Sequence, residues 1–245
     1  MNTPFLNVLL TFELDKSIKY LRLGLGEIKK ITAENDFYEP VFLFLSGGLE
    51  RLFKVVLCLN SLEKNNKLPR NGVIWNNQNG HDIIFLKKEI EKTCISINRY
   101  LEEEDFDIIQ NDDIINEICD VLAQYAKRGR YFDMDAILGN IQEFEPKSEW
   151  EKIEKKLNLK HYGAEFYDLI KSPEMLESII SNSNQLILER LERFIRAVIR
   201  QLIYGKIYSN SGQFVFQVAD FLNIADNQIG KTNYNDFAIY ESVRR

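Results

Sequence analysis

The sequence predicts an all-α protein, folded as an up-and-down bundle of about six to eight helices. Three observations support this prediction. Apolar residues recur at helical spacing through most of the 245-residue chain, several such stretches begin at a proline or a capping residue, and none shows the alternation typical of a β-strand. With 45% hydrophobic residues, the chain can bury one sizeable core, or an elongated core with a smaller satellite.

Four helices are expected in the N-terminal half. Thr3-Pro4 supplies the cap and first turn of the first helix, and Pro40 begins the second. The fourth follows a cap at Asn111-Asp112-Asp113. The expected ranges are about 3–31, 40–63, 82–103 and 113–127. The core face of the second helix is expected to hold Phe42, Leu45, Leu49, Leu52, Val56 and Leu59.

The C-terminal half is expected to contain a short helical turn, an amphipathic helix, a long helix that starts after Ser172, and a last short helix. Their expected ranges are about 134–138, 146–159, 173–204 and 211–223. We divide the chain into a helical bundle at residues 1–138 and a C-terminal helical region at residues 139–245. The second region is expected to pack on the first, either as a separate domain or as the part that completes the bundle.

Composition excludes several classes of protein. The formal net charge of −6 argues against a coat of duplex DNA, which would need a basic surface, but it leaves room for a local basic groove. The three cysteines are far apart and form no CxxC pair, so we expect buried, reduced thiols. The N-terminal segment lacks the basic region of a secretory signal, and the longest apolar runs are too short to span a bilayer. We therefore expect a cytoplasmic protein without membrane contact.

The common nucleotide and hydrolase motifs are absent. The chain contains no GxxxxGK[ST], no GxGxxG after a strand and no GxSxG, which removes the usual triphosphatase, dinucleotide and serine-hydrolase hypotheses. Its two histidines occur without HExxH and without a cysteine cluster. We expect neither a cofactor nor a metal, although the many carboxylates leave an oxygen-ligand site open.

The second predicted helix contains the first candidate site. Gly47-Gly48 interrupts an apolar helix, which is reasonable if another helix or a ligand must approach the backbone closely. Glu50 and Lys54 are spaced to form an ion pair, and Arg51 lies between them. A solvated face is the simpler interpretation. Because the surrounding helix is so apolar, however, we expect these charges to be paired or to face a cleft.

One of the two histidines is the candidate general base. His81 follows Asn79-Gly80 where the third helix should begin, and the positive end of the helix dipole favours a neutral imidazole. Such a group can accept a proton from a ribose 2′-hydroxyl. The alternative is a structural role, in which His81 hydrogen-bonds across the loop and caps the helix together with Asp82. His161 has no nearby pattern of carboxylates, and we expect it to be structural.

A basic turn after the fourth helix is the second candidate site. Arg128 and Arg130 flank Gly129, and Tyr131 follows directly. Guanidinium groups on such a turn can bind phosphate in a bidentate manner, while the tyrosine stacks on a base. The alternative is that the arginines neutralise the negative end of the helix dipole.

A stripe of arginines in the long C-terminal helix has two explanations. The stripe alternates with Glu189 and Glu192. Ion pairs within the helix explain it about as well as nucleic-acid binding does. The stripe consists of Arg190, Arg193, Arg196 and Arg200.

The chain resembles a known family over residues 1–135. FLSGGLERLFKVVLCL followed by GHDIIFLKKEI is similar to HEPN domains, which are all-helical prokaryotic modules that include abortive-infection proteins of the AbiV type and partners of minimal nucleotidyltransferases. The resemblance implies an up-and-down bundle that is often dimeric. In active branches it implies metal-independent RNA cleavage by an Arg and a His that face each other across the dimer. The family pattern places four to six residues between them, whereas ten residues separate Arg70 from His81 here. Members without the pattern act as binding or antitoxin-like modules.

The sequence therefore leads to two main hypotheses of function. The first is a HEPN-like protein of prokaryotic defence or toxin–antitoxin type that acts on RNA or a nucleotide, as a metal-independent ribonuclease if it is an enzyme. The second is a non-catalytic module that binds a ligand beside Gly47-Gly48, a partner protein encoded nearby, or a second copy of itself in a homodimer. In the first hypothesis the catalytic residues are His81, Glu50 and Arg51, and the substrate is bound by Lys54, Arg128, Arg130 and Tyr131.

Overall fold

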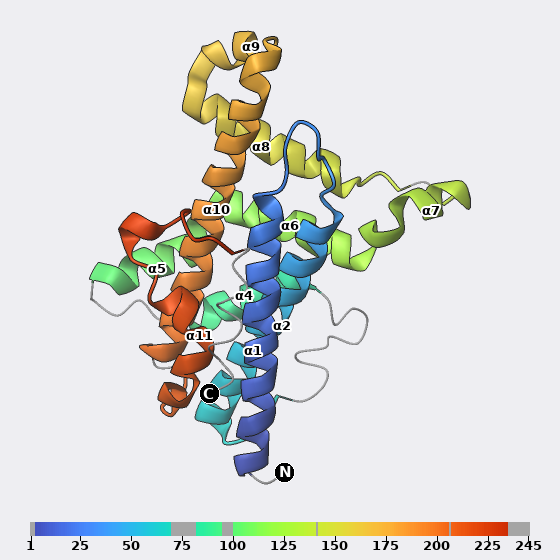
Figure 1. The fold of residues 1–245 in the computed structure, drawn as a ribbon. Helices are drawn as coiled ribbons and strands as arrows, with labels where there is room; N and C mark the ends of the chain where they lie inside the picture. The colour runs from blue at the N-terminus through green and yellow to red at the C-terminus, as the bar shows by residue number, and fades with distance from the viewer. Residues whose placement is uncertain (1–2, 70–81, 95–99, 141, 206, 235–245) are drawn as a thin grey trace.

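The computed structural model describes residues 3–69, 82–94, 100–140, 142–205 and 207–234. These ranges form an all-α bundle and contain no β-strand (Figure 1), which confirms the predicted fold class. Short 3-10 turns join several of the helices. The helices are α1 (Thr3–Ile28), α2 (Glu39–Asn65), α4 (Ile83–Thr93), α5 (Tyr100–Asn111), α6 (Asp113–Lys127), α7 (Phe132–Ile137), α8 (Pro146–Tyr162), α9 (Phe166–Leu169), α10 (Pro173–Ile203) and α11 (Val215–Leu222).

Helices α1 and α2 form a closely packed antiparallel pair. A Cβ on Gly48 would lie 2.8 Å from the side chain of Leu21, and Gly24 is packed against Leu45 in the same way. The hydroxyl of Ser17 donates a hydrogen bond of 2.8 Å to the backbone oxygen of Gly48. The expectation that another helix approaches the backbone at the glycine pair is therefore confirmed for Gly48.

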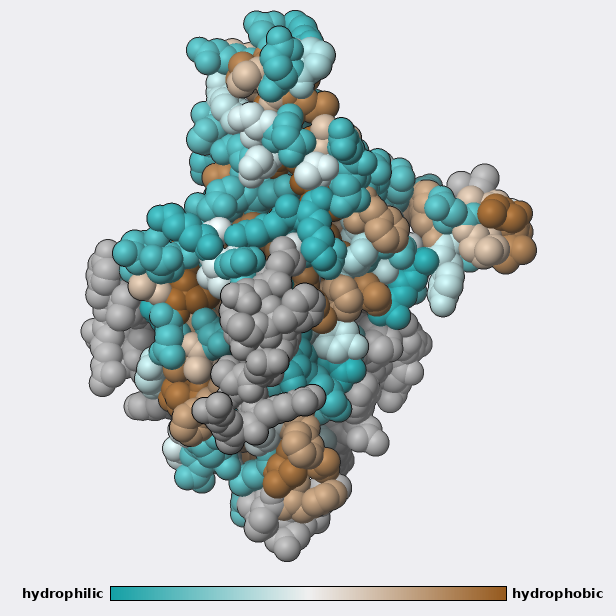
Figure 2. Space-filling view, in the orientation of Figure 1, coloured by the Kyte–Doolittle hydropathy of each residue, from teal (hydrophilic) through white to brown (hydrophobic). Residues whose placement is uncertain are grey.

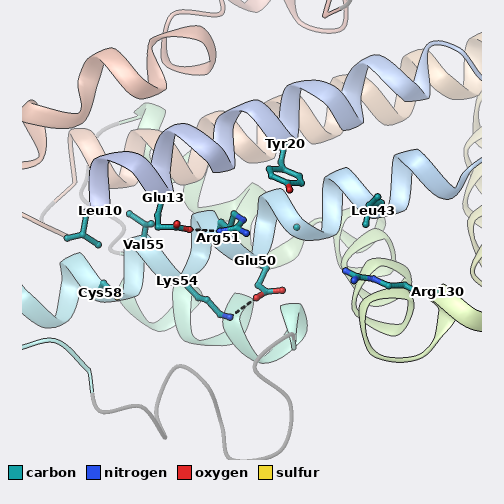
Figure 3. Close-up of a pocket in the computed structure, with 11 residues that line it drawn as sticks. Leu10, Glu13, Tyr20, Leu43, Glu50, Arg51, Lys54, Val55, Cys58 and Arg130 are labelled. Carbon is teal, nitrogen blue, oxygen red and sulfur yellow. Dashed lines mark hydrogen bonds and ion pairs between the residues drawn. The ribbon is translucent and has the colours of Figure 1, made fainter. Parts of the chain in front are cut away.

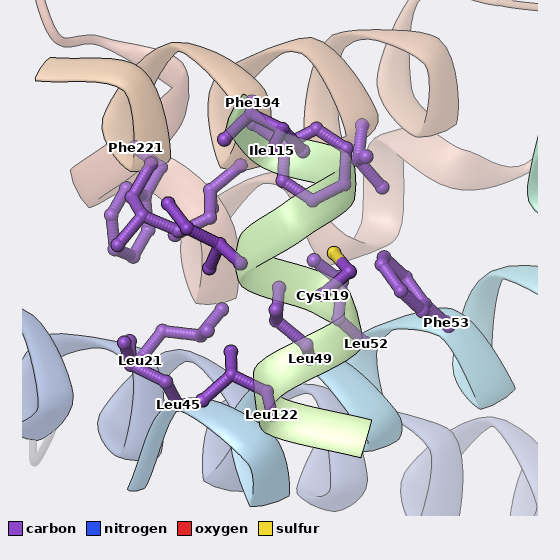
Figure 4. Packing of buried hydrophobic residues seen from close by; sticks show 14 of the residues in the cluster. Leu21, Leu45, Leu49, Leu52, Phe53, Ile115, Cys119, Leu122, Phe194 and Phe221 are labelled. Atoms are coloured by element: carbon purple, nitrogen blue, oxygen red, sulfur yellow. The ribbon is translucent and has the colours of Figure 1, made fainter. Parts of the chain in front are cut away.

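Helix α6 lies at the centre of the hydrophobic core (Figure 4). Asp112 caps its N-terminus by accepting a hydrogen bond of 3.1 Å from the backbone of Ile115, which confirms the predicted cap. Core residues of α6 lie between α2 on one side and α10 on the other. The predicted core face of α2 is buried along its whole length. Figure 4 labels Leu45, Leu49 and Leu52 of α2, Ile115, Cys119 and Leu122 of α6, and Phe194 of α10.

One predicted helix, at residues 82–103, is wrong. Helix α4 ends at Thr93, whose hydroxyl donates to the backbone oxygen of Ile90, and Cys94 adopts an extended conformation. The acidic run at residues 102–105 lies inside α5, which continues to Asn111. Its last residue, Asp105, is buried rather than solvated.

The C-terminal elements share the core of the N-terminal ones. Trp150, Ile153 and Leu157 of α8 belong to the same buried cluster as residues of α1 and α2, and so do nine residues of α10 between Ile187 and Leu202. Figure 1 shows two parts that extend from this body: α9 with the adjoining ends of α8 and α10, and the segment that carries α7. None of the described helices combines the length and the apolar composition needed to cross a lipid bilayer.

Candidate functional site

A cavity of about 690 Å³ lies beside the α1–α2 pair (Figure 3). The α2 residues that line it, at positions 43, 47, 50, 51, 54, 55 and 58, recur at helical spacing and therefore share a face. This face is offset from the core face at positions 42, 45, 49, 52, 56 and 59. Gly47 belongs to the cavity face. Among the described residues, the atoms within 4 Å of the position of its missing Cβ are those of the Tyr20 ring, at 3.5 Å and 3.6 Å. The uncharged lining residues are Leu10, Tyr20, Leu43, Gly47, Val55 and Cys58.

An ion pair between α1 and α2 forms one wall of the cavity. Arg51 Nη1 lies 2.5 Å from Glu13 Oε2, and the Arg51 guanidinium lies 5.5 Å from the centre of the Tyr20 ring. Partial burial opposes ionisation of Glu13, but hydrogen bonds from Lys16 and Arg51 hold the pKa of its carboxyl below the ordinary value. Arg51 is therefore fixed by a carboxylate and an aromatic ring at once.

A second ion pair lies on the same face, with its two residues on either side of Arg51 in the sequence. Lys54 Nζ is 2.6 Å from Glu50 Oε1, and the two side chains are only 12% and 14% exposed. The predicted pairing at this spacing is therefore present, and both side chains face the cavity. Low exposure makes the pair more sensitive to a ligand than a solvated pair would be, because fewer water molecules screen it.

Arg130 is the third cation of the cavity wall and differs from the other two. It follows Gly129 in the turn after α6, and Figure 3 shows its guanidinium directed toward α2. It lies 5.9 Å from the centre of the Tyr125 ring. In the part of the chain that the structure describes, no carboxylate lies within ion-pair distance of it. Gly129 is required at this turn because a Cβ there would collide with Pro146.

The other residues of the basic turn do not reach the cavity. Arg128 caps α6 through its backbone N–H, which donates to Gln124, and its side chain is exposed. The Tyr131 ring is 69% exposed and does not line the cavity either. The structure thus brings Glu50, Arg51, Lys54 and Arg130 together, but it does not add Arg128 and Tyr131 to them.

His81 lies outside the described residues, and so does the loop that precedes it. The next residue, Asp82, caps α4 by accepting a hydrogen bond of 3.0 Å from the backbone of Phe85. The Asp82 carboxylate also accepts a hydrogen bond of 2.7 Å from Lys127 Nζ. Partial burial of Asp82 opposes ionisation, but the bond from Lys127 keeps the pKa of its carboxyl below the ordinary value. His161 lies near the end of α8, where its ring contacts Tyr162 edge to face.

Three polar lining residues, Glu13, Tyr20 and Cys58, were not predicted from the sequence. Glu13 and Tyr20 belong to α1, and nothing in their local pattern indicates that α2 brings Arg51 to both of them. Cys58 was treated only as a buried thiol, yet it is partly exposed in the cavity. Burial raises the pKa of its thiol to about 11, despite the nearby Lys54, so the protonated form dominates at neutral pH. Among the described residues, no group of three or more His, Cys, Asp and Glu side chains is arranged to hold a metal ion.

The arginine stripe of α10 forms ion pairs with other elements of the fold. Every ion-pair partner that the structure describes for these arginines lies on another element. Arg190 Nη1 is 2.6 Å from Asp112 at the start of α6, and Arg196 Nη2 is 2.6 Å from Asp226. Arg193 and Arg200 are paired with acidic residues of α5, at 3.9 Å and 3.4 Å. The predicted ion pairs within the helix are therefore wrong.

No known protein family, curated protein or solved structure matches the chain. Two ion pairs supply both carboxylate acceptors and cationic donors, Arg130 adds a cation without a carboxylate partner among the described residues, and the remaining wall is mostly apolar. Such a cavity can hold a molecule that has an anionic end, several polar groups and an apolar body.

Proposed function

We propose that this protein is a helical binding module whose cavity takes a small organic anion of mononucleotide size. The proposal depends on Arg130, a cation of the cavity wall for which the described residues supply no carboxylate. A volume of about 690 Å³ is in the range of pockets that enclose small ligands. An anion beside Arg130 would complete the charge balance of the wall.

Each part of a mononucleotide has a complementary group in the cavity. The phosphate would accept hydrogen bonds from Arg130, whose planar guanidinium suits bidentate binding. The hydroxyl and amino groups would donate to the carboxylates of Glu13 and Glu50. The base would lie against Tyr20 and the apolar wall, and Gly47 would let it approach the backbone of α2.

The ion pairs favour binding over proton transfer. Glu50 and Arg51, both predicted to be catalytic, are held by Lys54 and Glu13. The Glu50 carboxylate already accepts from the Lys54 ammonium, and the Arg51 guanidinium already donates to Glu13. These residues are therefore better suited to orient a ligand than to exchange protons with it.

Calorimetric titration with adenosine monophosphate, adenosine and inorganic phosphate tests this proposal. We expect the monophosphate to bind, and adenosine to bind more weakly because it lacks the anionic group. Arg130→Gln should weaken binding of the monophosphate by about 10- to 100-fold, the usual value of a charge-assisted hydrogen bond. Arg128→Gln is the matched control, since it removes a guanidinium two positions away that does not line the cavity. No binding by any of the three compounds, or equal effects of the two substitutions, would contradict the proposal.

A HEPN-like ribonuclease is the second candidate function. One observation favours it: Asp82, the residue after His81, is bonded to Lys127, three positions before Arg130. This bond tethers the chain next to His81 to the end of the helix that leads to Arg130. His81 would then act as general base and Arg130 would stabilise charge on the phosphorane.

RNA cleavage in the presence of EDTA tests the second candidate. Wild-type protein should cleave a mixed RNA substrate, and His81→Ala and Arg130→Gln should not. His161→Ala is the matched control, because it removes the other histidine and should keep activity. If wild-type protein does not cleave RNA, the binding function stands alone.

The proposal also covers the cellular location, the biological role and the self-association of the protein. We propose a cytoplasmic protein of prokaryotic defence or toxin–antitoxin type that self-associates as a homodimer, as the resemblance to HEPN domains implies. A partner protein encoded nearby is the alternative form of association. Sedimentation analysis of the purified protein, alone and with the products of neighbouring genes, distinguishes the two.

A further inference from the structure

Two apolar surfaces of this chain have no partner within the described residues. The first lies on the α7 arm, which we define as residues 129–140, and Figure 1 shows the arm extending from the side of the bundle. No residue of α7 is buried. Figure 2 shows hydrophobic surface on the tip of the arm. Four large side chains, between 53% and 76% exposed, form this surface: Tyr131, Met134, Ile137 and Leu138.

The α7 arm has a defined shape. The side chain of Gln142 donates hydrogen bonds to Asp135 and to the backbone oxygen of Arg128, which ties the end of the arm to its base. Within the arm, Met134 and Leu138 are four positions apart and belong to one helical turn, which the hydrogen bond from the Leu138 N–H to the Met134 oxygen closes. The arm therefore presents its apolar side chains on a folded element, although it buries none of them in its own chain.

The second apolar surface is the α1 stripe, which we define as Phe5, Val8, Leu9 and Phe12. These residues follow the i, i+3, i+4, i+7 spacing of a single helix face. They are between 38% and 56% exposed, and the face differs from those that contact the core and the cavity. Figure 2 shows hydrophobic surface near the end of the molecule where α1 begins.

We propose that the two surfaces bind each other between two copies of this chain. The α7 arm of one copy lies on the α1 stripe of the second, and the reverse contact is made at the same time, as two-fold symmetry requires. The proposal rests on the self-association proposed above and names its interface. It does not depend on ligand binding, because neither the four arm side chains nor the α1 stripe line the cavity.

The size of the two contacts fits a stable dimer. If most of the exposed apolar surface of both arms and both stripes were covered, the interface would bury on the order of 1,500 Å², which is typical of specific complexes. One arm on one stripe would cover only about half of that area, so the reciprocal arrangement is favoured over an open chain.

The charges near the two surfaces differ, since the arm is acidic and the first turn of α1 has no acidic side chain. The arm carries Asp133 and Asp135 beside its apolar side chains. The first turn of α1 contains no acidic residue, so its own side chains do not neutralise the positive end of the helix dipole. An arm that lies on the α1 stripe would bring its carboxylates close to this end.

Sedimentation velocity over a series of protein concentrations tests the interface with three variants. Ile137→Asp places a charge on the arm and Phe12→Asp places one on the stripe. Each should weaken the dimer by on the order of 100-fold, because a central apolar contact is lost twice in a symmetric dimer. Ile170→Asp is the control, since it changes an exposed apolar side chain elsewhere and should leave the dimer intact. Circular dichroism and the thermal midpoint check that each variant is folded.

A mixture of the two variants tests the pairing itself. In a heterodimer of Ile137→Asp with Phe12→Asp, one of the two contacts joins an unchanged arm to an unchanged stripe. The mixture should therefore associate more tightly than either variant alone. Contacts of arm with arm, or of stripe with stripe, would give no such recovery.

The sedimentation experiments can contradict the proposal in three ways. A wild-type monomer at every concentration overturns both the self-association and this interface. A dimer that survives both substitutions overturns the interface and leaves self-association in place. Two monomeric variants that do not recover on mixing overturn the pairing of arm with stripe.

Discussion

Gly48 of α2 and Leu21 of α1 define the distance between the first two helices. A Cβ on Gly48 would lie 2.8 Å from the Leu21 side chain and 3.0 Å from its backbone nitrogen. Gly47, the adjacent residue, faces the cavity instead, where the nearest atom lies 3.5 Å from the position of a Cβ. Two consecutive glycines therefore have different roles, one in packing and the other in the shape of the candidate site.

The two glycines should respond differently to alanine. Gly48→Ala should lower the free energy of unfolding by about 1–3 kcal/mol, because the new methyl group forces apart helices that are already in contact. Gly47→Ala should be neutral or raise it by up to about 1 kcal/mol, because alanine favours the helix and has room. Urea unfolding of the two variants checks this prediction. Equal effects would show that the helices are not in this contact.

The arginines of the α10 stripe should contribute to the free energy of unfolding in proportion to how deeply each is buried. Arg196 is buried and donates hydrogen bonds of 2.7 Å to the backbone oxygen of Ile224 and 2.6 Å to Asp226. Arg196→Leu should cost about 2–4 kcal/mol, because it leaves a buried carbonyl without a donor. Arg193→Leu is the control and should change stability by less than about 0.5 kcal/mol, since its ion pair is exposed. A larger loss for Arg193 than for Arg196 in chemical unfolding would refute the structural role.

A half-buried carboxyl in α8 should make stability depend on pH. Glu154 accepts hydrogen bonds from Tyr38 at 3.0 Å and from Trp150 at 3.1 Å. Burial raises the pKa of its carboxyl from 4.5 to about 7, and Glu151 adds to the effect. The folded state therefore holds this proton more tightly than the unfolded chain does. Its contribution to stability is complete below pH 4.5 and is lost as the pH rises to about 7.

Glu154→Gln should remove this part of the pH dependence, because glutamine keeps the acceptor oxygen and does not ionise. The variant should match wild-type protein near pH 4.5 and be more stable at pH 8, by about 1–3 kcal/mol. Glu149→Gln, in the same helix and paired with Lys152 at the surface, is the control and should not change the slope. Thermal unfolding over this pH range is the measurement, and parallel curves for wild type and Glu154→Gln would contradict it.

The three cysteines should react with a thiol reagent in a fixed order. Cys58 should react first in native protein because it is partly exposed in the cavity. Cys94 and Cys119 are buried and should react only when the protein unfolds. Because its thiol has a pKa of about 11 rather than 9.0, Cys58 should react roughly 100-fold more slowly at pH 8 than an unperturbed thiol. Kinetics with Ellman's reagent, with Cys58→Ser as control, check the order. Rapid reaction of Cys94 or Cys119 in folded protein would contradict it.

Much of the helical structure was predictable because helix formation depends on residues that are close to one another in the sequence. The core face of α2, the Asp112 cap of α6 and the start of α10 after Ser172 follow from spacing and capping residues a few positions apart. The break after Thr93 was missed because apolar residues continue at helical spacing through it. Local pattern does not reveal a helix end that no Gly or Pro marks.

The sequence by itself determined the all-α class, the pairing of Glu50 with Lys54, and the need for close approach at the glycine pair. Only the tertiary structure decided that Glu13 holds Arg51, that Arg130 joins the cavity while Arg128 does not, and that the α10 arginines are paired with other elements. The physical reason is the range of the interactions. Backbone hydrogen bonds and i, i+4 pairs are fixed by neighbours in sequence, whereas a cavity and its ion pairs depend on how whole helices pack.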